Sequence, residues 1–203
     1  MTTFGSTIES LRREANLGIR ELCRLQEKSG TVHDPMSPAY LSRLEKGSGQ
    51  VVSDKITLDK LWGLGVALSV CPLALFVLSR PVIDLAYAAE AERRKLFATL
   101  DVPDSVSLSS YLRQLRESKM MSLSEVSRVA FQAPAHFGVS PGFLSQLETN
   151  HRNVSTIVSG DKLWALGVVY GVDPLGLFVM SRGIDAKYRE HAKRLSLFLR
   201  RSV

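Results

Sequence analysis

The chain has 203 residues, of which 45% are hydrophobic and 23% are charged, and its formal net charge is +6. This is the composition of an ordinary soluble protein of one or two domains. The excess of positive charge favours a polyanionic partner, either nucleic acid or an acidic membrane surface, and does not choose between them. The opening "MTTFGSTIES" lacks the basic cluster and apolar core of a secretory signal, so a cytoplasmic location is predicted. The two cysteines, Cys23 and Cys71, belong to no Cys/His ligand pattern, which argues against a metal site.

Three helices are predicted near the start of the chain. Apolar residues recur at helical spacing in "IESLRREANL" (8–17) and in "GIRELCRLQ" (18–26). After a polar loop, "SPAYLSRLEKG" (37–47) carries its own boundary signals, with Ser37 as the helix N-cap and Gly47 as the terminator.

The outer face of this third predicted helix carries Tyr40, Ser42, Arg43 and Lys46. Hydroxyl groups and a cationic fork are the groups that read base edges and hold phosphates, and a short helix with a positive N-terminal dipole fits a major groove. The same residue types occur on ordinary solvated helix faces, so this helix alone leaves both interpretations open.

The next segment, "LWGLGVALSVCPLALFVLS" (61–79), is free of charged residues and long enough for a transmembrane helix. Its near-twin "LWALGVVYGVDPLGLFVMS" (163–181) contains Asp173, which is costly in a bilayer but is a suitable N-cap before Pro174. Each run is therefore predicted to be two short helices broken at a proline, and no membrane segment is expected. Close packing between neighbouring helices is the preferred role of four glycines in these runs: Gly63, Gly65, Gly167 and Gly171.

These strings show that the chain consists of two similar halves. "SPAYLSRLEKG" recurs as "SPGFLSQLETN" with a separation of 140 − 37 = 103 residues, and "DKLW" recurs with a separation of 161 − 59 = 102. A spacing of about 100 residues is too long for a solenoid repeat and predicts a tandem pair of small domains. The boundary is placed at "DVPDSVS", which gives domains 1–100 and 101–203.

The order of elements resembles the lambda-repressor-like and Cro-like (XRE) helix-turn-helix family. That family has a first helix with an "LR" start, a scaffold helix, a recognition helix of the "xxLSRLExG" type and two closing helices reading "LxxLAxALGVxPxxLF". Here "LRREANLGIRELCRLQ", "SPAYLSRLEKG" and "LDKLWGLGVALSVCPLALF" take those places, and the second half matches with "YLRQLRESKMMSLSEVSRVA", "SPGFLSQLETN" and "DKLWALGVVYGVDPLGLF". The resemblance covers roughly residues 8–78 and 108–180. It implies an all-α fold of two tandem five-helix domains, and each is followed here by a longer C-terminal helix.

The resemblance further implies that the third helix of each domain, 37–46 and 140–149, enters the major groove of DNA. The positions where the family reads bases are occupied by Ala39, Tyr40, Ser42 and Arg43, and by Gly142, Phe143, Ser145 and Gln146. With the helix ends and the following loops, the predicted DNA-binding residues are Ser37, Ala39, Tyr40, Ser42, Arg43, Lys46, Lys55, Ser140, Gly142, Phe143, Ser145, Gln146, Asn150, His151 and Arg152. The loop residues in this set are equally consistent with ordinary solvated loops.

Glu45 and Glu148 are expected to have a structural role instead. In the family this glutamate pairs with an arginine of the first helix, for which the candidates here are Arg12 or Arg13 and Arg113 or Arg116.

One departure from the family pattern is the connection between scaffold and recognition helices. It is a few residues in the family but covers 28–36 here, with a similar extension at 131–139. The angle between those helices is therefore not fixed by the resemblance.

A second departure is the lower charge of the second recognition helix, where Gln146 and Thr149 replace Arg43 and Lys46. Glutamine can still read adenine through a bidentate contact. Three interpretations stay open for the second half: a reader of an unequal half-site, an architectural domain or a protein-binding domain. The first is preferred.

The sequence offers little support for a catalytic or metal-binding site. His33 and His136 stand at matching positions, 136 − 33 = 103 residues apart, and a packing or loop role is preferred because no repeated cysteine or carboxylate accompanies them. The sequence contains no Ser/His/Asp or Cys/His arrangement and no Gly-rich phosphate loop. Neither an enzyme activity nor a cofactor is predicted.

The tail of each half is predicted to be a longer helix. In the second tail an apolar stripe is flanked by Lys193, Arg194, Arg200 and Arg201, and such an amphipathic helix could cover the other half of the chain or pair with a second chain. A homodimer is preferred, with the predicted contacts Ile184, Tyr188, Leu195, Phe198 and Leu199.

Together these features predict a sequence-specific double-stranded DNA-binding transcriptional regulator, with repression as the simplest mechanism. The alternative is a protein-interaction module of the antitoxin or assembly-factor type, in which the helix-turn-helix domains hold a protein partner.

Overall fold

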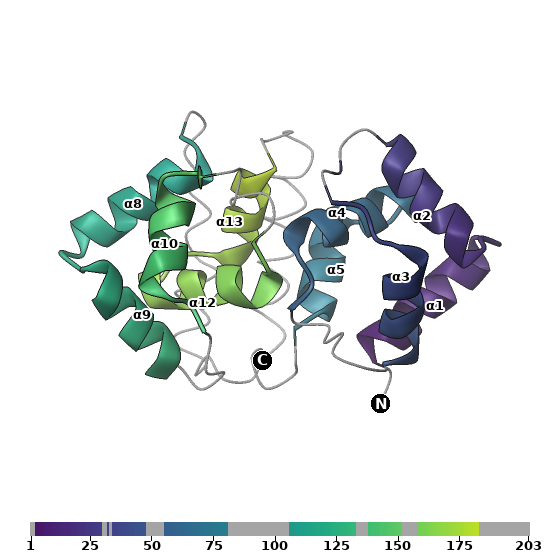
Figure 1. Cartoon of the computed structure of the whole chain (residues 1–203), viewed down its shortest axis with the longest axis horizontal. Coiled ribbons are helices and arrows are strands. Elements are labelled where there is room, and N and C mark those ends of the chain that lie inside the picture. Colours follow the sequence, from purple (N-terminus) through teal and green to yellow (C-terminus); the bar gives the residue numbers. More distant parts are fainter. Residues whose placement is uncertain are drawn as a thin grey trace. The chain divides into compact units, whose positions relative to one another are not determined.

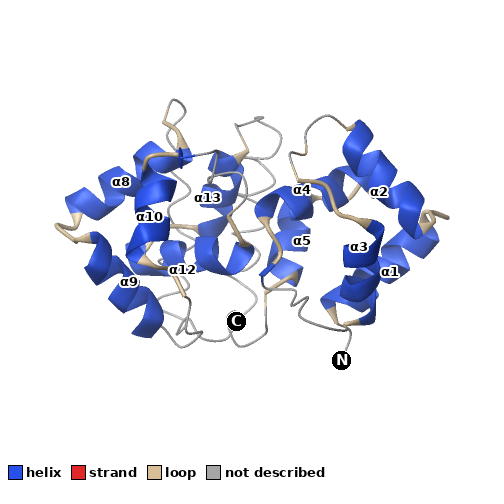
Figure 2. Ribbon diagram, in the orientation of Figure 1, coloured by secondary structure: helices blue, strands red, loops and turns tan. Residues whose placement is uncertain are grey.

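The computed structural model describes residues 3–29, 32, 34–47, 55–80, 106–132, 138–151 and 158–182. These residues form ten α-helices and no β-strand, which confirms the all-α prediction for the described part of the chain (Figures 1 and 2). Contacts between residues divide the chain into two compact units, Met1–Pro81 and Val82–Val203. The sequence boundary after residue 100 lies outside the described residues.

The first unit contains five described helices, whose bounds are α1 Phe4–Glu14, α2 Ile19–Lys28, α3 Pro38–Lys46, α4 Leu58–Ala67 and α5 Pro72–Leu78. Helix α1 begins four residues before the predicted segment because Thr3 caps it. The Thr3 hydroxyl accepts a hydrogen bond from the Ser6 backbone N–H at 3.2 Å, and the Ser6 hydroxyl accepts one from the Thr3 N–H at 2.9 Å.

The second unit contains the corresponding described helices, α8 Leu108–Ser118, α9 Leu123–Gln132, α10 Pro141–Glu148, α12 Gly160–Tyr170 and α13 Pro174–Ser181. Their first residues follow those of the first unit by 104 for α8 and α9 (108 − 4, 123 − 19), by 103 for α10 (141 − 38), and by 102 for α12 and α13 (160 − 58, 174 − 72). The loop before α10 is therefore one residue shorter than the loop before α3, and α10 is one residue shorter than α3, while the helices correspond one for one.

Both apolar runs are broken at their prolines, as the sequence predicts. Pro72 and Pro174 each occupy the first turn of a new helix, and the Asp173 carboxylate caps α13 by accepting a hydrogen bond from the Leu175 N–H at 2.8 Å. Among the described helices, none has both the length and the apolar character needed to cross a membrane.

Glycines opposite these prolines allow the two closing helices of each unit to pack closely. A Cβ atom built on Gly65 would lie 2.6 Å from Cγ of Pro72, and one built on Gly167 would lie 2.6 Å from Cγ of Pro174. The predicted packing role is confirmed for these two residues. It is wrong for Gly171, which ends α12 with a φ of 63° and has open space around it.

We expect the Gly65→Ala substitution to lower the free energy of unfolding by about 1–3 kcal/mol, because the added methyl group overpacks the contact with Pro72. Urea unfolding followed by circular dichroism measures the change. Gly142→Ala is the matched control: this exposed helical glycine has no neighbouring atom within 4 Å, so alanine should be neutral or stabilise by up to about 1 kcal/mol. A more stable Gly65→Ala protein would contradict the packing argument.

Candidate nucleic-acid interface

A buried ion pair attaches α3 to α1. Arg12 Nε and Nη2 donate hydrogen bonds to Glu45 Oε1 and Oε2, both at 2.7 Å, and Arg12 Nη1 donates to the Leu17 carbonyl at 2.9 Å. The two side chains are 11% and 5% exposed. The hydrogen bond to Glu45 raises the pKa of Arg12 against the opposing effect of burial, so the guanidinium stays charged. The predicted partner of Glu45 is confirmed as Arg12 rather than Arg13.

The same arrangement recurs in the second unit. Arg116 Nε and Nη2 donate to Glu148 Oε1 and Oε2 at 2.7 and 2.8 Å, and Nη1 donates to the Met121 carbonyl at 3.0 Å. Arg116 rather than Arg113 is the partner. In both units one arginine therefore ties the first helix, the turn after it and the third helix together.

Three contacts pin the long connection between α2 and α3. The side-chain oxygen of Gln26 accepts a hydrogen bond from the Met36 N–H at 3.2 Å, and the Asp59 carboxylate accepts one from the Asp34 N–H at 2.6 Å. The carboxylate of Asp34 in turn pairs with the ammonium group of Lys60. Because Gln26 and Asp59 are completely buried, the last residues before α3 are fixed from the core side.

The outer face of α3 presents most of the predicted DNA-binding residues of the first unit. Ala39, Arg43 and Lys46 are exposed and Ser42 is partly exposed, while the Ser37 hydroxyl accepts a hydrogen bond from the Tyr40 N–H at 3.2 Å. Arg43 makes one local contact, from Nε to the Ala39 carbonyl at 3.3 Å. Its terminal guanidinium nitrogens therefore project from an exposed helical turn.

Tyr40 differs from its neighbours because it is half-buried beside α4. The Lys60 ammonium lies 5.6 Å from the centre of its ring, close enough for a cation–π contact. Burial and the Asp34 carboxylate raise the pKa of Tyr40, and Arg43 opposes this shift. The phenol is therefore neutral at physiological pH, and it is available only at the edge of the face.

In the second unit the outer face of α10 is polar but uncharged. Gly142, Ser145 and Gln146 are exposed, and the Ser140 hydroxyl caps the helix by accepting a hydrogen bond from the Phe143 N–H at 3.2 Å. Phe143 takes the place of Tyr40: it is half-buried, with the Lys162 ammonium 4.1 Å from the centre of its ring. The contact between α4 and the aromatic residue of α3 is thus repeated between α12 and α10.

The predicted loop residues are only partly described. Lys55, Asn150 and His151 are exposed, and Asn150 adopts a left-handed conformation with a φ of 49° just after α10. The other predicted loop residue, Arg152, lies outside the described residues, as do His33 and His136 and the predicted dimer contacts Ile184, Tyr188, Leu195, Phe198 and Leu199.

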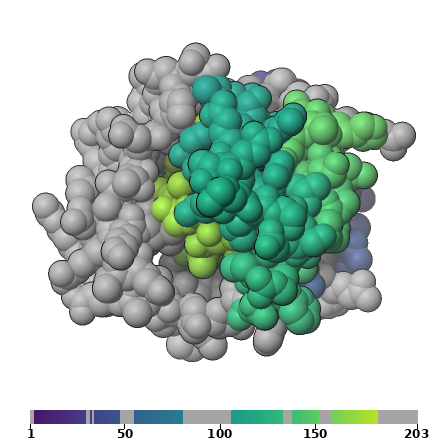
Figure 3. Space-filling view, turned by 90° about the vertical axis from the view of Figure 1, so that its left-hand side faces the viewer, coloured from purple at the N-terminus to yellow at the C-terminus, as the bar shows by residue number. Residues whose placement is uncertain are grey.

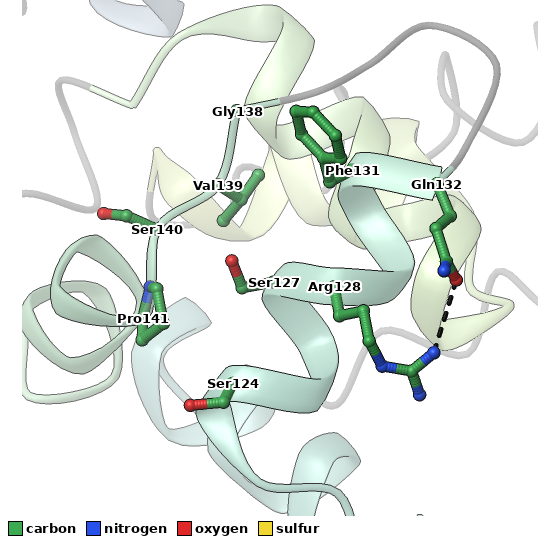
Figure 4. Close-up of a pocket in the computed structure, with 9 residues that line it drawn as sticks. All are labelled: Ser124, Ser127, Arg128, Phe131, Gln132, Gly138, Val139, Ser140 and Pro141. Carbon is green, nitrogen blue, oxygen red and sulfur yellow. Dashed lines mark hydrogen bonds between the residues drawn. The ribbon is translucent and has the colours of Figure 1, made fainter.

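An open groove of about 520 Å³ lies between α9 and the start of α10. One wall is the segment from Gly138 to Pro141 and the other is the outer side of α9, from which Phe131, 64% exposed, projects (Figure 4). The Arg128 guanidinium donates a hydrogen bond to the Gln132 side-chain oxygen at 3.4 Å. In the space-filling view, the surfaces of α8 and α9 (teal) lie beside that of α10 (green) on one face of the unit (Figure 3).

Sequence reasoning missed the contribution of the second helix to this surface. Arg20, Arg24 and Lys28 occur every fourth residue along α2, and all three are exposed. The spacing was visible in the sequence, but only the structure places the corresponding positions of α9 beside the third helix.

A scan against protein-family models, a search of curated proteins and a search of solved structures each found no match to this chain. Within the described residues, no group of three or more histidine, cysteine, aspartate or glutamate side chains is arranged to hold a metal ion.

We expect Arg12→Ala to lower the free energy of unfolding by about 3–5 kcal/mol, because it leaves the buried Glu45 carboxylate unpaired. The adjacent variant Arg13→Ala is the control: Arg13 is 71% exposed and pairs with exposed Glu9, so its loss should cost less than about 1 kcal/mol. Urea unfolding of both variants gives the comparison.

Removing both buried charges, with Arg12→Met and Glu45→Leu together, should cost less than Arg12→Ala alone. Equal losses for Arg12→Ala and Arg13→Ala would show that the bidentate pair does not hold α3.

Proposed function

We propose that the protein is a sequence-specific double-stranded DNA-binding transcriptional regulator, built as two tandem helix-turn-helix domains of the lambda-repressor-like type. Helices α3 and α10 are the proposed recognition helices. The observation that carries the proposal is the repeated arrangement of a short third helix, anchored on its inner side by a buried arginine and glutamate, with an exposed outer face. An element held so firmly from behind can present side chains to a rigid partner at little entropic cost.

The residues of the two outer faces have the chemistry that base reading requires. The exposed fork of Arg43 can make a bidentate contact with guanine, and the exposed amide of Gln146 can do the same with adenine. Ala39 and Gly142, at equivalent positions in the first turn of each helix, have small side chains that permit close approach to the duplex. Phosphate contacts would come from Lys46 and the loop cations.

The proposed mechanism is occupation of promoter or operator DNA in the cytoplasm, with repression by exclusion of polymerase. We further propose a homodimer formed through the C-terminal stripe that contains Tyr188 and Phe198. A dimer with four recognition helices would cover an extended, approximately palindromic site.

A second candidate function is favoured by the groove beside α10. An open hollow of about 520 Å³ with a phenylalanine 64% exposed at its wall suits a polypeptide better than a phosphate backbone. The second unit would then hold a protein partner, as in an antitoxin or assembly factor. Purified protein that shows no DNA affinity but co-purifies with one polypeptide would favour this candidate.

The decisive experiment is selection of a preferred duplex from a randomised pool, followed by fluorescence anisotropy with that duplex and a scrambled one over a salt series. Nanomolar affinity for the selected duplex, with far weaker binding to the scrambled one, is the expected result. Failure to bind any duplex at low salt would overturn the proposal.

We expect Arg43→Ala to weaken binding to the selected duplex by about 1–3 kcal/mol and to relax the preference at one base pair, because a bidentate base contact is lost. Anisotropy with duplexes that vary one base pair at a time measures both effects. Gln146→Ala, at the equivalent position of the second unit, should act at a different base pair. Equal losses on the selected and scrambled duplexes would contradict base reading by Arg43.

A further inference from the structure

The outer side of α2 carries a line of positive charge. Arg20, Arg24 and Lys28 are spaced four residues apart and exposed, and none of them makes an ion pair with another described residue. At 1.5 Å per residue, the line extends over about 12 Å of the helix. Three cations on one helix face repel one another in the free protein, and an anion placed against them would relieve that repulsion.

The groove of the second unit shows where this line lies. Helices α2 and α9 are both ten residues long and begin 104 residues apart, so Arg20, Arg24 and Lys28 correspond to Ser124, Arg128 and Gln132. All three of these α9 residues line the groove beside the start of α10 (Figure 4). From this correspondence we place the cations of α2 beside the start of α3, next to the face that presents Ala39 and Arg43.

The surface formed by the second and third helices differs strongly in charge between the two units. In the first unit α2 and α3 carry five cationic side chains against two carboxylates, once the buried pair with Arg12 is set aside: Arg20, Arg24, Lys28, Arg43 and Lys46 against Glu21 and Glu27. In the second unit α9 and α10 carry Arg128 against Glu125, with Glu148 paired to Arg116. The net charge is +3 in the first unit and zero in the second.

Helices α2 and α9 also differ in how the N–H groups of their first turns are capped. Helix α2 begins after Gly18, which provides no side-chain cap, so its first N–H groups are available to an anion. At the start of α9 the Glu125 carboxylate accepts a hydrogen bond from the Ser122 N–H at 2.6 Å, and the Ser122 hydroxyl accepts one from the Glu125 N–H at 3.2 Å. These hydrogen bonds lower the pKa of Glu125. Helix α2 also has a glutamate in its first turn, Glu21 at the equivalent position, so the two starts differ in capping and not in charge.

We infer that the two units make different contributions to DNA binding: the cationic line of Arg20, Arg24 and Lys28, together with Lys46, supplies most of the phosphate contacts, and the second unit contacts bases with little phosphate neutralisation. The inference rests on the proposed function. One strand of a duplex carries a charge every 3.4 Å or so along its axis, so a line of about 12 Å can face several phosphates.

The test measures how the observed binding constant depends on salt for the selected duplex. Each phosphate neutralised contributes about 0.9 to the slope of log Kobs against log salt. The triple variant R20Q/R24Q/K28Q should lower the magnitude of this slope by about 2–3. It should weaken the selected and scrambled duplexes equally, since phosphate contacts carry no sequence information.

Arg24→Gln and Arg128→Gln form the matched pair, because they are equivalent positions of the two units (128 − 24 = 104). Arg24→Gln should lower the slope by about 1, whereas Arg128→Gln should leave it unchanged. Gln146→Ala should weaken the selected duplex alone, without changing the slope. All the substituted side chains are exposed, and unchanged thermal unfolding would verify that the variants fold.

Equal slope changes for Arg24→Gln and Arg128→Gln would overturn the division between the units, and an unaltered slope for the triple variant would overturn the phosphate role of α2. In both cases tight binding of the unmodified protein to the selected duplex would leave the proposed function standing. An unmodified protein that binds no duplex would overturn both proposals.

Discussion

The position of the third helix in each unit depends on one arginine. Arg12 and Arg116 each donate two hydrogen bonds to a glutamate of the third helix. Each also donates one to a backbone carbonyl in the turn that follows the first helix. Desolvating both charges is expensive, and the three hydrogen bonds offset that cost only in one geometry. A planar guanidinium that is held at both edges fixes the direction of the carboxylate as well as its distance. The glutamate therefore determines which side of α3 or α10 faces outward, and the properties of the outer surface follow from this internal contact.

The rest of each unit allows the helices to come close enough for that contact. A Cβ atom on Gly5 would lie 2.1 Å from the Leu44 carbonyl oxygen, so α1 approaches the end of α3 more closely than any larger residue permits. Gly65 and Gly167 have the same role between the closing helices, where they contact the prolines that begin α5 and α13. On the side of α4 and α12, Lys60 and Lys162 lie over the aromatic residue of the third helix. Each third helix is thus held by an ion pair on its inner side and by a cation–π contact near its start.

Local signals predicted much of this arrangement. The N-caps Ser37 and Asp173, the end of α3 at Gly47 and the breaks at Pro72 and Pro174 depend on residues close in sequence, and each is found where expected. What the sequence left open depends on contacts between distant segments. Arg12 and Arg13 are adjacent on one helix, and only the packing of α1 decides which of them turns inward. The burial of Asp59 against the loop before α3 joins residues 25 positions apart, and no local pattern announces it. The groove beside α10 and the placement of the α2 cations are likewise products of tertiary packing.

Comparison of the two units separates the residues that build the scaffold from those that define its surface. The buried arginine and glutamate, the glycine and proline contacts and the lysine over an aromatic ring occur in both units. The differences lie on the outer side: Ser124 replaces Arg20, Phe131 replaces Glu27, and Gln146 replaces Arg43. None of these positions contributes to the buried core, so a change of charge there leaves the helix positions intact. Affinity that comes from phosphates is long-ranged and falls with salt, whereas base contacts are short-ranged and depend on sequence. Under the proposed function, two copies of one scaffold let the chain adjust these two contributions independently, with more exposed cations on the second and third helices of one copy and uncharged polar groups on the other.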